Sequence, residues 1–196
     1  MQPVRFHHQE TQRRGWRFVQ GWGAGTGINV AKGEIKNDEF KLAYEAGRAA
    51  KYHLDANWES DMIVYVQYGQ AGGSRKDKAK TDEIMEASRK EMAHDKHAIQ
   101  LMLGDFNVEP NSLDVSKELF EEEQWIDVGE KARWWGGTAN EKTCQTRPQA
   151  KPTRIDGILA SREAVVWIKK FEVERDDMIP THSVLKLYLQ RGAAAE

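Results

Sequence analysis

The sequence is short of several residue types and segment types, and each shortage narrows the class of protein. Its single cysteine, Cys144, cannot form an internal disulfide, and with no Cys/His cluster near it we expect a small core residue rather than a zinc ligand. No apolar run approaches the roughly 18 residues that cross a bilayer. The first fourteen residues lack the apolar stretch of a secretion signal. We therefore expect an intracellular protein with no membrane association, and the sequence does not separate nucleus from cytoplasm.

A net positive charge is also missing. The formal net charge is −2 and the pI is about 6.3, so the chain has no global basic field of the kind that marks many nucleic-acid binders. Any binding of nucleic acid must come from a local patch. The 196 residues, 39% hydrophobic and 31% charged, suit one globular core. We expect a monomer with a single domain over residues 1–190 and a disordered tail at 191–196.

The most informative stretch is residues 99–110, IQLMLGDFNVEP. A short apolar run typical of a buried strand stops at residues 104–107, GDFN. Asp105 and Asn107 are two residues apart, so while the backbone stays extended both side chains leave the same face of the sheet. An equally good interpretation of this stretch alone is that Asp and Asn cap a turn.

Two later stretches each set one ionisable residue in strand-like apolar sequence. They are residues 153–159, TRIDGIL, and residues 179–185, IPTHSVL. An unpaired charge is costly in such surroundings, which indicates that Asp156 and His182 have partners. For His182 alone, a satisfied histidine at a strand end is the competing interpretation.

With GDFN, RIDGIL and PTHSVL in this order, the chain resembles the endonuclease/exonuclease/phosphatase superfamily, metal-dependent phosphoesterases that include abasic-site and retroelement endonucleases. The resemblance covers residues 61–189 well and the first sixty poorly. It implies an α/β (α+β) fold, a four-layer sandwich of two mixed β-sheets packed face to face and flanked by helices. The superfamily's first strand has no counterpart before Gln9, so we expect an N-terminally truncated member.

The resemblance also implies catalytic roles. Asp105 would orient or deprotonate the attacking water, and Asn107 would donate a hydrogen bond to the phosphate. Asp156 would pair with His182 and hold the imidazole against a phosphoryl oxygen. Tyr68, at the end of the strand-like run DMIVYVQY, would place its hydroxyl near the scissile phosphate. Strand tyrosines are more generally packing groups, which is the alternative for Tyr68.

By the same resemblance, the metal ligand is Glu10 in the sequence Gln9-Glu10-Thr11, and the cofactor is Mg²⁺ or Mn²⁺. The preceding residues are less apolar than the strand that normally leads to this pair. The superfamily also commonly has Ser-Asp-His where this chain has Pro180-Thr181-His182. Thr181 cannot supply a charge, so metal binding would rest on Glu10 or be weaker.

Residues 131–151 interleave basic and aromatic side chains in a loop-rich segment. Such a mixture suits phosphate contact and base stacking, although tryptophan pairs also anchor loops onto cores. The candidate nucleic-acid contacts in and just after this segment are Arg133, Trp134, Trp135, Arg147 and Arg154.

The sequence therefore predicts a metal-dependent phosphodiester hydrolase, foremost an endonuclease acting on DNA. The alternatives are a phosphatase of the same superfamily and a catalytically impaired remnant that only binds nucleic acid or protein. For the remaining elements we expect helices over residues 76–96 and 112–123, and a helical turn or two in the alanine-rich segment within residues 38–58.

Overall fold

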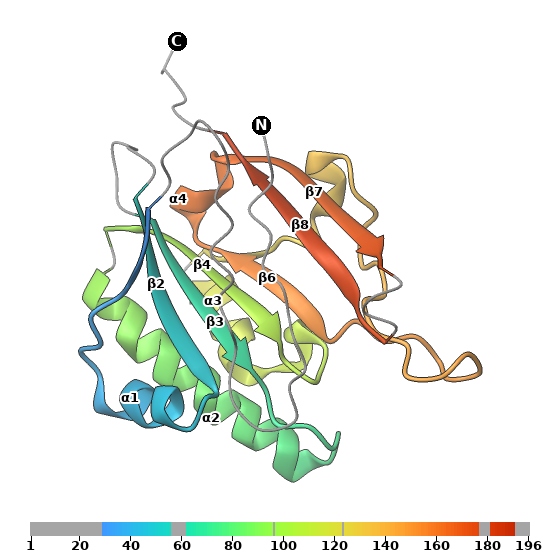
Figure 1. Ribbon diagram of the computed structural model, residues 1–196, viewed down its shortest axis with the longest axis horizontal. Coiled ribbons are helices and arrows are strands. Elements are labelled where there is room, and N and C mark those ends of the chain that lie inside the picture. Colours follow the sequence, from blue (N-terminus) through green and yellow to red (C-terminus); the bar gives the residue numbers. More distant parts are fainter. Residues whose placement is uncertain (1–28, 56–61, 96, 123, 177–180, 191–196) are drawn as a thin grey trace.

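A six-stranded mixed sheet forms the centre of the protein (Figure 1). The computed structural model describes residues 29–55, 62–95, 97–122, 124–176 and 181–190, and the statements below concern these residues. The strand order is β1-β2-β3-β4-β6-β5, in which β3 and β4 are parallel and all other neighbours are antiparallel. The strands are β1 (Asn29–Lys32), β2 (Ala49–Asp55), β3 (Met62–Tyr68), β4 (Ile99–Asp105), β5 (Ile126–Asp127) and β6 (Asp156–Ala160).

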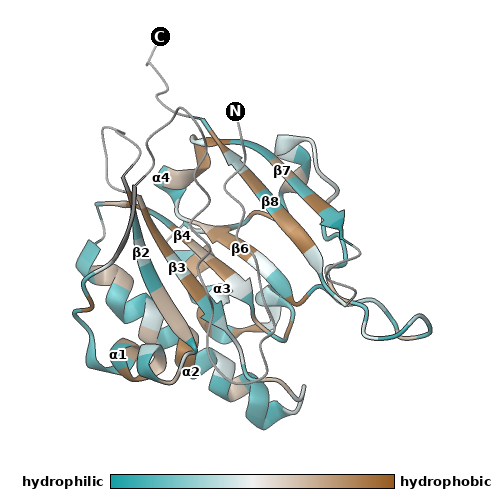
Figure 2. Cartoon of the chain, in the orientation of Figure 1, coloured by the Kyte–Doolittle hydropathy of each residue, from teal (hydrophilic) through white to brown (hydrophobic). Residues whose placement is uncertain are grey.

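Three helices cover one face of this sheet, α1 (Asp38–Glu45), α2 (Arg75–Met92) and α3 (Asp114–Glu122). The parallel pair β3 and β4 needs a crossover connection, and α2 supplies it. Side chains of β3 alternate between the two faces. Ile63 and Tyr65 pack under the helices, whereas Val64 and Val66 pack on the other side. Because both faces are covered, β3 and β4 are hydrophobic almost throughout, as their brown colour in Figure 2 shows.

A second, smaller sheet lies over the other face of the large one, away from α1 and α2 (Figure 1). It consists of β7 (Ile168–Arg175) and β8 (Ser183–Leu189), which are antiparallel. The short helix α4 (Arg162–Val165) and the 3₁₀ turn η3 (Ala132–Trp135) also contribute to the core on this side. Two further 3₁₀ turns are η1 (Ala93–Asp95) and η2 (Pro110–Ser112). The expected α+β sandwich is confirmed, with a second sheet that is an antiparallel pair in the described residues.

Residues 38–58 contain the expected helical turns at their start, where α1 forms, but Ala49 and Ala50, which follow, are in a strand. The helix α1 ends at Glu45, and Gly47, at a φ of 69°, donates its N–H to the Tyr44 carbonyl as a helix terminator. The following residues form β2, with Ala49 in the core under the helices and Ala50 in the core between the sheets. Pairing with strands on both sides therefore overrides the helical propensity of alanine.

In the part of the chain that the structure describes, no helix is both long enough and apolar enough to cross a membrane. The expectation of one domain over residues 1–190 stays a prediction, because residues 1–28 lie outside the described part.

Candidate active site

One row of side chains crosses the large sheet where β3 and β4 end. Tyr68 is the register partner of Asp105, and Asp105 is the register partner of Asp156 on β6. Arg48 extends the row, since its carbonyl accepts a 2.9 Å hydrogen bond from the Tyr68 N–H. Directly opposed residues of neighbouring strands project from the same face, so these side chains share the face that turns toward β7 and β8. These four residues are far apart in the sequence, but they lie side by side at the ends of neighbouring strands.

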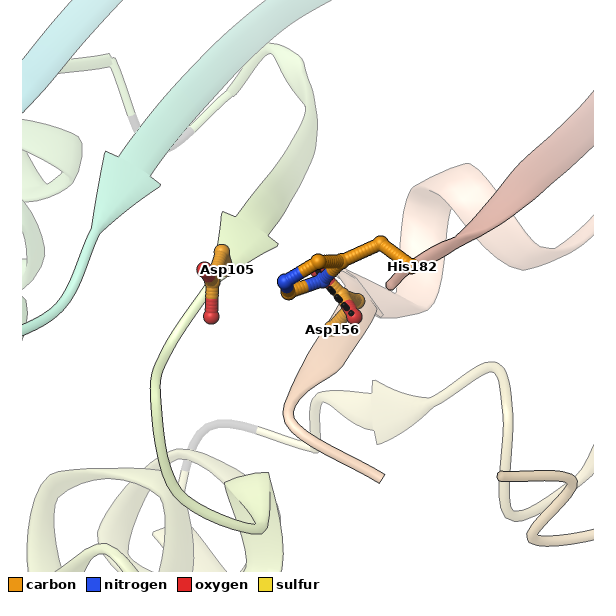
Figure 3. A group of neighbouring side chains, drawn as sticks. All are labelled: Asp105, Asp156 and His182. Carbon is orange, nitrogen blue, oxygen red and sulfur yellow. Dashed lines mark hydrogen bonds and ion pairs between the residues drawn. The ribbon is translucent and has the colours of Figure 1, made fainter. Parts of the chain in front are cut away.

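Asp105, Asp156 and His182 converge at this level (Figure 3). One ligand atom from each lies within 4.8 Å of the other two. His182 Nδ1 is 3.0 Å from Asp156 Oδ2 and 3.2 Å from Oδ1. The Asp105 residue is only 6% exposed, while the side chains of Asp156 and His182 are 14% and 24% exposed. The cluster is therefore largely shielded from water, with the histidine as its most accessible member.

A segment that the sequence did not indicate positions the histidine. Cys144 forms isolated β-bridges with both Thr153 and His182, so it links the start of β6 to the start of β8. Next to it, the buried Thr143 accepts hydrogen bonds at Oγ1 from the N–H groups of Ile155 and Asp156. The segment around Cys144 thus fixes Asp156 and His182 relative to each other.

The thiol of Cys144 belongs to the site itself. Its Sγ lies 3.8 Å from His182 Nε2, on the opposite side of the ring from Asp156. Burial raises the pKa of this thiol, and the nearby carboxylates of Asp156 and Asp105 raise it further. The expectation of a small buried residue is confirmed, but its position beside His182 could not be read from the sequence.

The backbone at Asn107 is not extended, in contrast to the expectation from the sequence. The strand β4 ends at Asp105, and Asn107 has a φ of 56°, in the left-handed region that asparagine tolerates. Its N–H donates to Asp105 Oδ1 at 2.9 Å, and its side-chain Nδ2 donates to the Gly69 carbonyl at 3.0 Å. Asn107 therefore forms a turn that holds the Asp105 carboxylate, which combines the two interpretations weighed for this stretch.

Arg48 is a cation at this edge that sequence reasoning missed. Its guanidinium carbon lies 5.1 Å from the centre of the Tyr68 ring, and its Nη1 donates to the Gly69 carbonyl at 3.2 Å. The only sequence signal was a lone arginine between Gly47 and Ala49, which carries no motif. Its position in the row makes it a candidate for contact with a phosphate group.

Gly69 is the point where the loops after β3 and β4 touch. Its N–H donates to the Asp105 carbonyl at 2.7 Å, and an added Cβ would lie 2.1 Å from the Phe106 carbonyl oxygen. Gly73, in the same loop, has no heavy atom within 4 Å of an added Cβ, and its φ is 73°. The two glycines thus separate a steric requirement from a purely conformational one.

We expect Gly69→Ala to lower the free energy of unfolding by about 3 kcal/mol, because overpacking against a backbone carbonyl forces the two loops apart. The control Gly73→Ala should lower the free energy of unfolding by only about 1 kcal/mol, which is the cost of an alanine in the left-handed backbone conformation. Urea denaturation of both variants measures the difference. Equal losses of stability in the two variants would contradict the prediction, since they would show that the two loops move apart at Gly69 without a steric cost.

The candidate nucleic-acid residues fall into different environments. Arg133 and Arg147 are exposed, and Trp134 is 63% exposed. Trp135 meets Trp134 edge to face at 5.6 Å and packs against the core between the sheets. These four stay predictions as nucleic-acid contacts.

Arg154 does not fit the surface role expected of it. It is only 3% exposed, and its Nη1 donates to Asp127 Oδ1 at 2.9 Å and to Oδ2 at 2.7 Å. The guanidinium of Arg154 is therefore occupied by the buried carboxylate of Asp127. This environment argues against a surface contact with nucleic acid at Arg154, and the contact stays a prediction.

The expected metal ligand, Glu10, lies outside the described residues, as does Pro180. Among the described residues, Asp105 and Asp156 offer the hard carboxylate oxygens that Mg²⁺ and Mn²⁺ prefer, within reach of a single ion. The donors present therefore fit a divalent cation, and the choice between Mg²⁺ and Mn²⁺ is open.

Solved structures share this fold, while no protein-family model and no curated protein matches the chain. A 3′-5′ exonuclease (NExo) from Neisseria meningitidis is 19% identical, with a TM-score of 0.53 over 84% of this chain and 72% of that one. TDP2 from Caenorhabditis elegans is 14% identical, with a TM-score of 0.53 over 82% and 51%. An endonuclease/exonuclease/phosphatase family protein from Bacteroides thetaiotaomicron is 17% identical, with a TM-score of 0.46 over 71% and 54%.

The first two likenesses show that the chain shares the fold of these two proteins, in agreement with the α+β fold expected from the sequence. The chain spans between about half and three quarters of the length of these three proteins.

Proposed function

We propose that the protein is a metal-dependent phosphoester hydrolase whose active centre is the cluster of Asp105, Asp156 and His182. The observation that carries the proposal is their convergence within 4.8 Å from three separate segments, in register with Tyr68 on the neighbouring strand. Burying two carboxylates on the inner face of a sheet costs free energy, because each must lose its hydration. Such a cluster is therefore more readily explained by a function than by chance.

The residues divide the work of hydrolysis between them. Asp105 is held by the Asn107 N–H at 2.9 Å, which fixes a carboxylate that can orient and deprotonate water. Asp156 binds His182 Nδ1, so the imidazole presents Nε2 as the group that hydrogen-bonds a phosphoryl oxygen. The Asn107 side-chain amide donates one of its two hydrogens to the Gly69 carbonyl, and the second can donate to the phosphate. A divalent cation held by Asp105 and Asp156, with Glu10, would neutralise charge on the phosphoryl oxygens.

We further propose DNA as the substrate and internal cleavage of the strand as the reaction. The support is the sequence resemblance to abasic-site and retroelement endonucleases, together with the fold shared with NExo, one structure of which is bound to a product DNA hairpin. Exposed Arg133, Trp134 and Arg147 supply the charge and the stacking surface that a strand requires.

A panel of substrates tests the proposal. We expect the full chain with Mg²⁺ to cleave DNA carrying an abasic site, a nick or supercoils, and to lose that activity in EDTA, because the cation supplies the charge neutralisation. Release of phosphate from monoesters alone would support the phosphatase alternative. A folded protein inactive on every substrate would contradict the proposal and favour the remnant that only binds.

A further inference from the structure

We propose that the start of helix α2 carries a second contact surface for the substrate, a basic patch of Arg75, Lys76 and Lys80 that binds phosphates of the DNA backbone beside the active centre. The inference deepens the proposed function and rests on it, since it states where the DNA on one side of the cleaved bond lies. The patch is separate from the nucleic-acid contacts predicted from the sequence, which lie in and just after residues 131–151.

The charge of this surface differs from that of the whole chain. Residues 75–80, RKDKAK, carry four basic side chains and one acidic side chain, whereas the formal net charge of the chain is −2. The three patch residues are exposed, and the fourth cation, Lys78, is half-buried. The carboxylate of Asp77 accepts hydrogen bonds from the N–H and the hydroxyl of Ser74, as part of a capping box. The exposed charge at the start of α2 is therefore mainly positive.

The stability of the helix does not explain these cations. The first turn of a helix carries a partial positive charge, so it favours acidic side chains and disfavours basic ones. Lys76 and Lys80 are also four positions apart in α2, a spacing at which like charges on a helix repel each other. Basic side chains that face solvent and weaken their own helix indicate an anionic partner outside it.

The loop before α2 holds the patch beside the active centre. Gly69, its first residue, donates its N–H to the Asp105 carbonyl, and the Gln70 N–H donates to Thr81 Oγ1 on α2 at 2.9 Å. The helix therefore begins at the edge of the large sheet where β3 and β4 end, as Figure 1 shows. The chain between the end of β3 and the start of α2 spans at most about 25 Å. Because duplex DNA rises about 3.4 Å per base pair, the patch can contact phosphates within about seven base pairs of the cleaved bond.

The chemistry of the patch fits a chain of phosphates. Lysine and arginine neutralise backbone phosphates whatever the base, and each contact releases counterions and makes binding more sensitive to salt. A small phosphoester needs only the active centre, whereas a DNA strand continues beyond it and can also contact the patch. The patch is therefore expected to favour DNA over small phosphoesters as the substrate.

Binding of a fluorescently labelled DNA duplex to the full chain in EDTA, measured by anisotropy over a range of salt concentrations, tests the patch without cleavage. Arg75→Gln combined with Lys76→Gln should bind more weakly. Its plot of log affinity against log salt should lose about two units of slope, about one for each phosphate contact. This variant should stay folded, because both changes remove unfavourable charge from the first turn of α2.

The matched control is Arg162→Gln combined with Lys169→Gln, which removes the same charge from two exposed residues beyond the end of β6 that is remote from Asp156. It should bind DNA with the wild-type slope. An unchanged slope in the patch variant, or an equal change in the control, would overturn the inference. Binding of the wild type to phosphatidylserine vesicles but not to DNA would also overturn it, since the anionic partner would then be a lipid surface.

The binding assay separates this inference from the proposed function. A wild type that binds DNA through the patch but cleaves no substrate with Mg²⁺ would contradict the proposed function alone. A wild type that cleaves DNA, with a patch variant that binds DNA as the wild type does, would contradict this inference alone.

Discussion

Asp156→Asn and His182→Ala are each expected to lower the rate of hydrolysis by about 10²- to 10⁴-fold, and the double variant by little more than either alone. The two side chains meet at 3.0 Å, and Asp156 orients the imidazole that contacts the phosphoryl oxygen in the proposed mechanism. Residues that act as one unit are strongly non-additive, so removal of either removes most of what the pair supplies. Rates would be measured under saturating metal on variants shown to be folded by circular dichroism.

Losses that multiply in the double variant would contradict the pairing, since they would show that Asp156 and His182 serve independent steps. Because Asp156→Asn keeps the size of the side chain, a loss in this variant reports on its charge.

The buried ion pair of Arg154 and Asp127 is expected to dominate the stability of the region beside the active centre. Arg154→Met should lower the free energy of unfolding by about 3 to 5 kcal/mol, because it leaves the Asp127 carboxylate buried without a counter-charge. The side chains are 3% and 1% exposed, so water cannot take the place of the guanidinium. Chemical denaturation measures the loss.

Two comparisons make this stability prediction specific. Lys142→Met breaks an exposed ion pair with Glu109 and should cost about 1 kcal/mol or less. Arg154→Met combined with Asp127→Leu should recover much of the loss, because the unpaired charge is then gone. A marginal effect of Arg154→Met on stability, accompanied by weaker DNA binding, would instead restore the surface role that the structure argues against.

The resemblance carried by GDFN, RIDGIL and PTHSVL was enough to predict the α+β fold and the pairing of Asp156 with His182, both of which the structure shows. GDFN and RIDGIL each border an apolar strand, and the structure pairs these strands so that Asp105 faces Asp156. His182 stands directly before β8, the last strand, and its ring reaches Asp156 at the same edge. Such an arrangement is predictable because ionisable residues next to buried strands need partners.

What the sequence could not predict depends on contacts between distant residues. Arg154 was a candidate nucleic-acid contact as one of the basic residues in and just after residues 131–151, yet its partner Asp127 stands 27 positions away with no motif to connect them. Cys144 gave no signal in the sequence except that it is the single cysteine, and its contact with His182 spans 38 positions. Arg48 gave no signal because it stands in alanine-rich sequence whose local propensity indicated helix, whereas the residues directly after it form the strand β2.

The central claim, that the cluster around Asp105 performs the hydrolysis, is tested most directly by the rate of phosphodiester cleavage in Asp105→Asn beside Glu109→Gln. Both changes remove one carboxylate charge without changing side-chain size, and Glu109 is exposed on the loop that follows Asp105. We expect Asp105→Asn, with wild-type stability, to cleave at least about 10²-fold more slowly, and Glu109→Gln to cleave at the wild-type rate. Equal cleavage by Asp105→Asn and wild type would contradict the account.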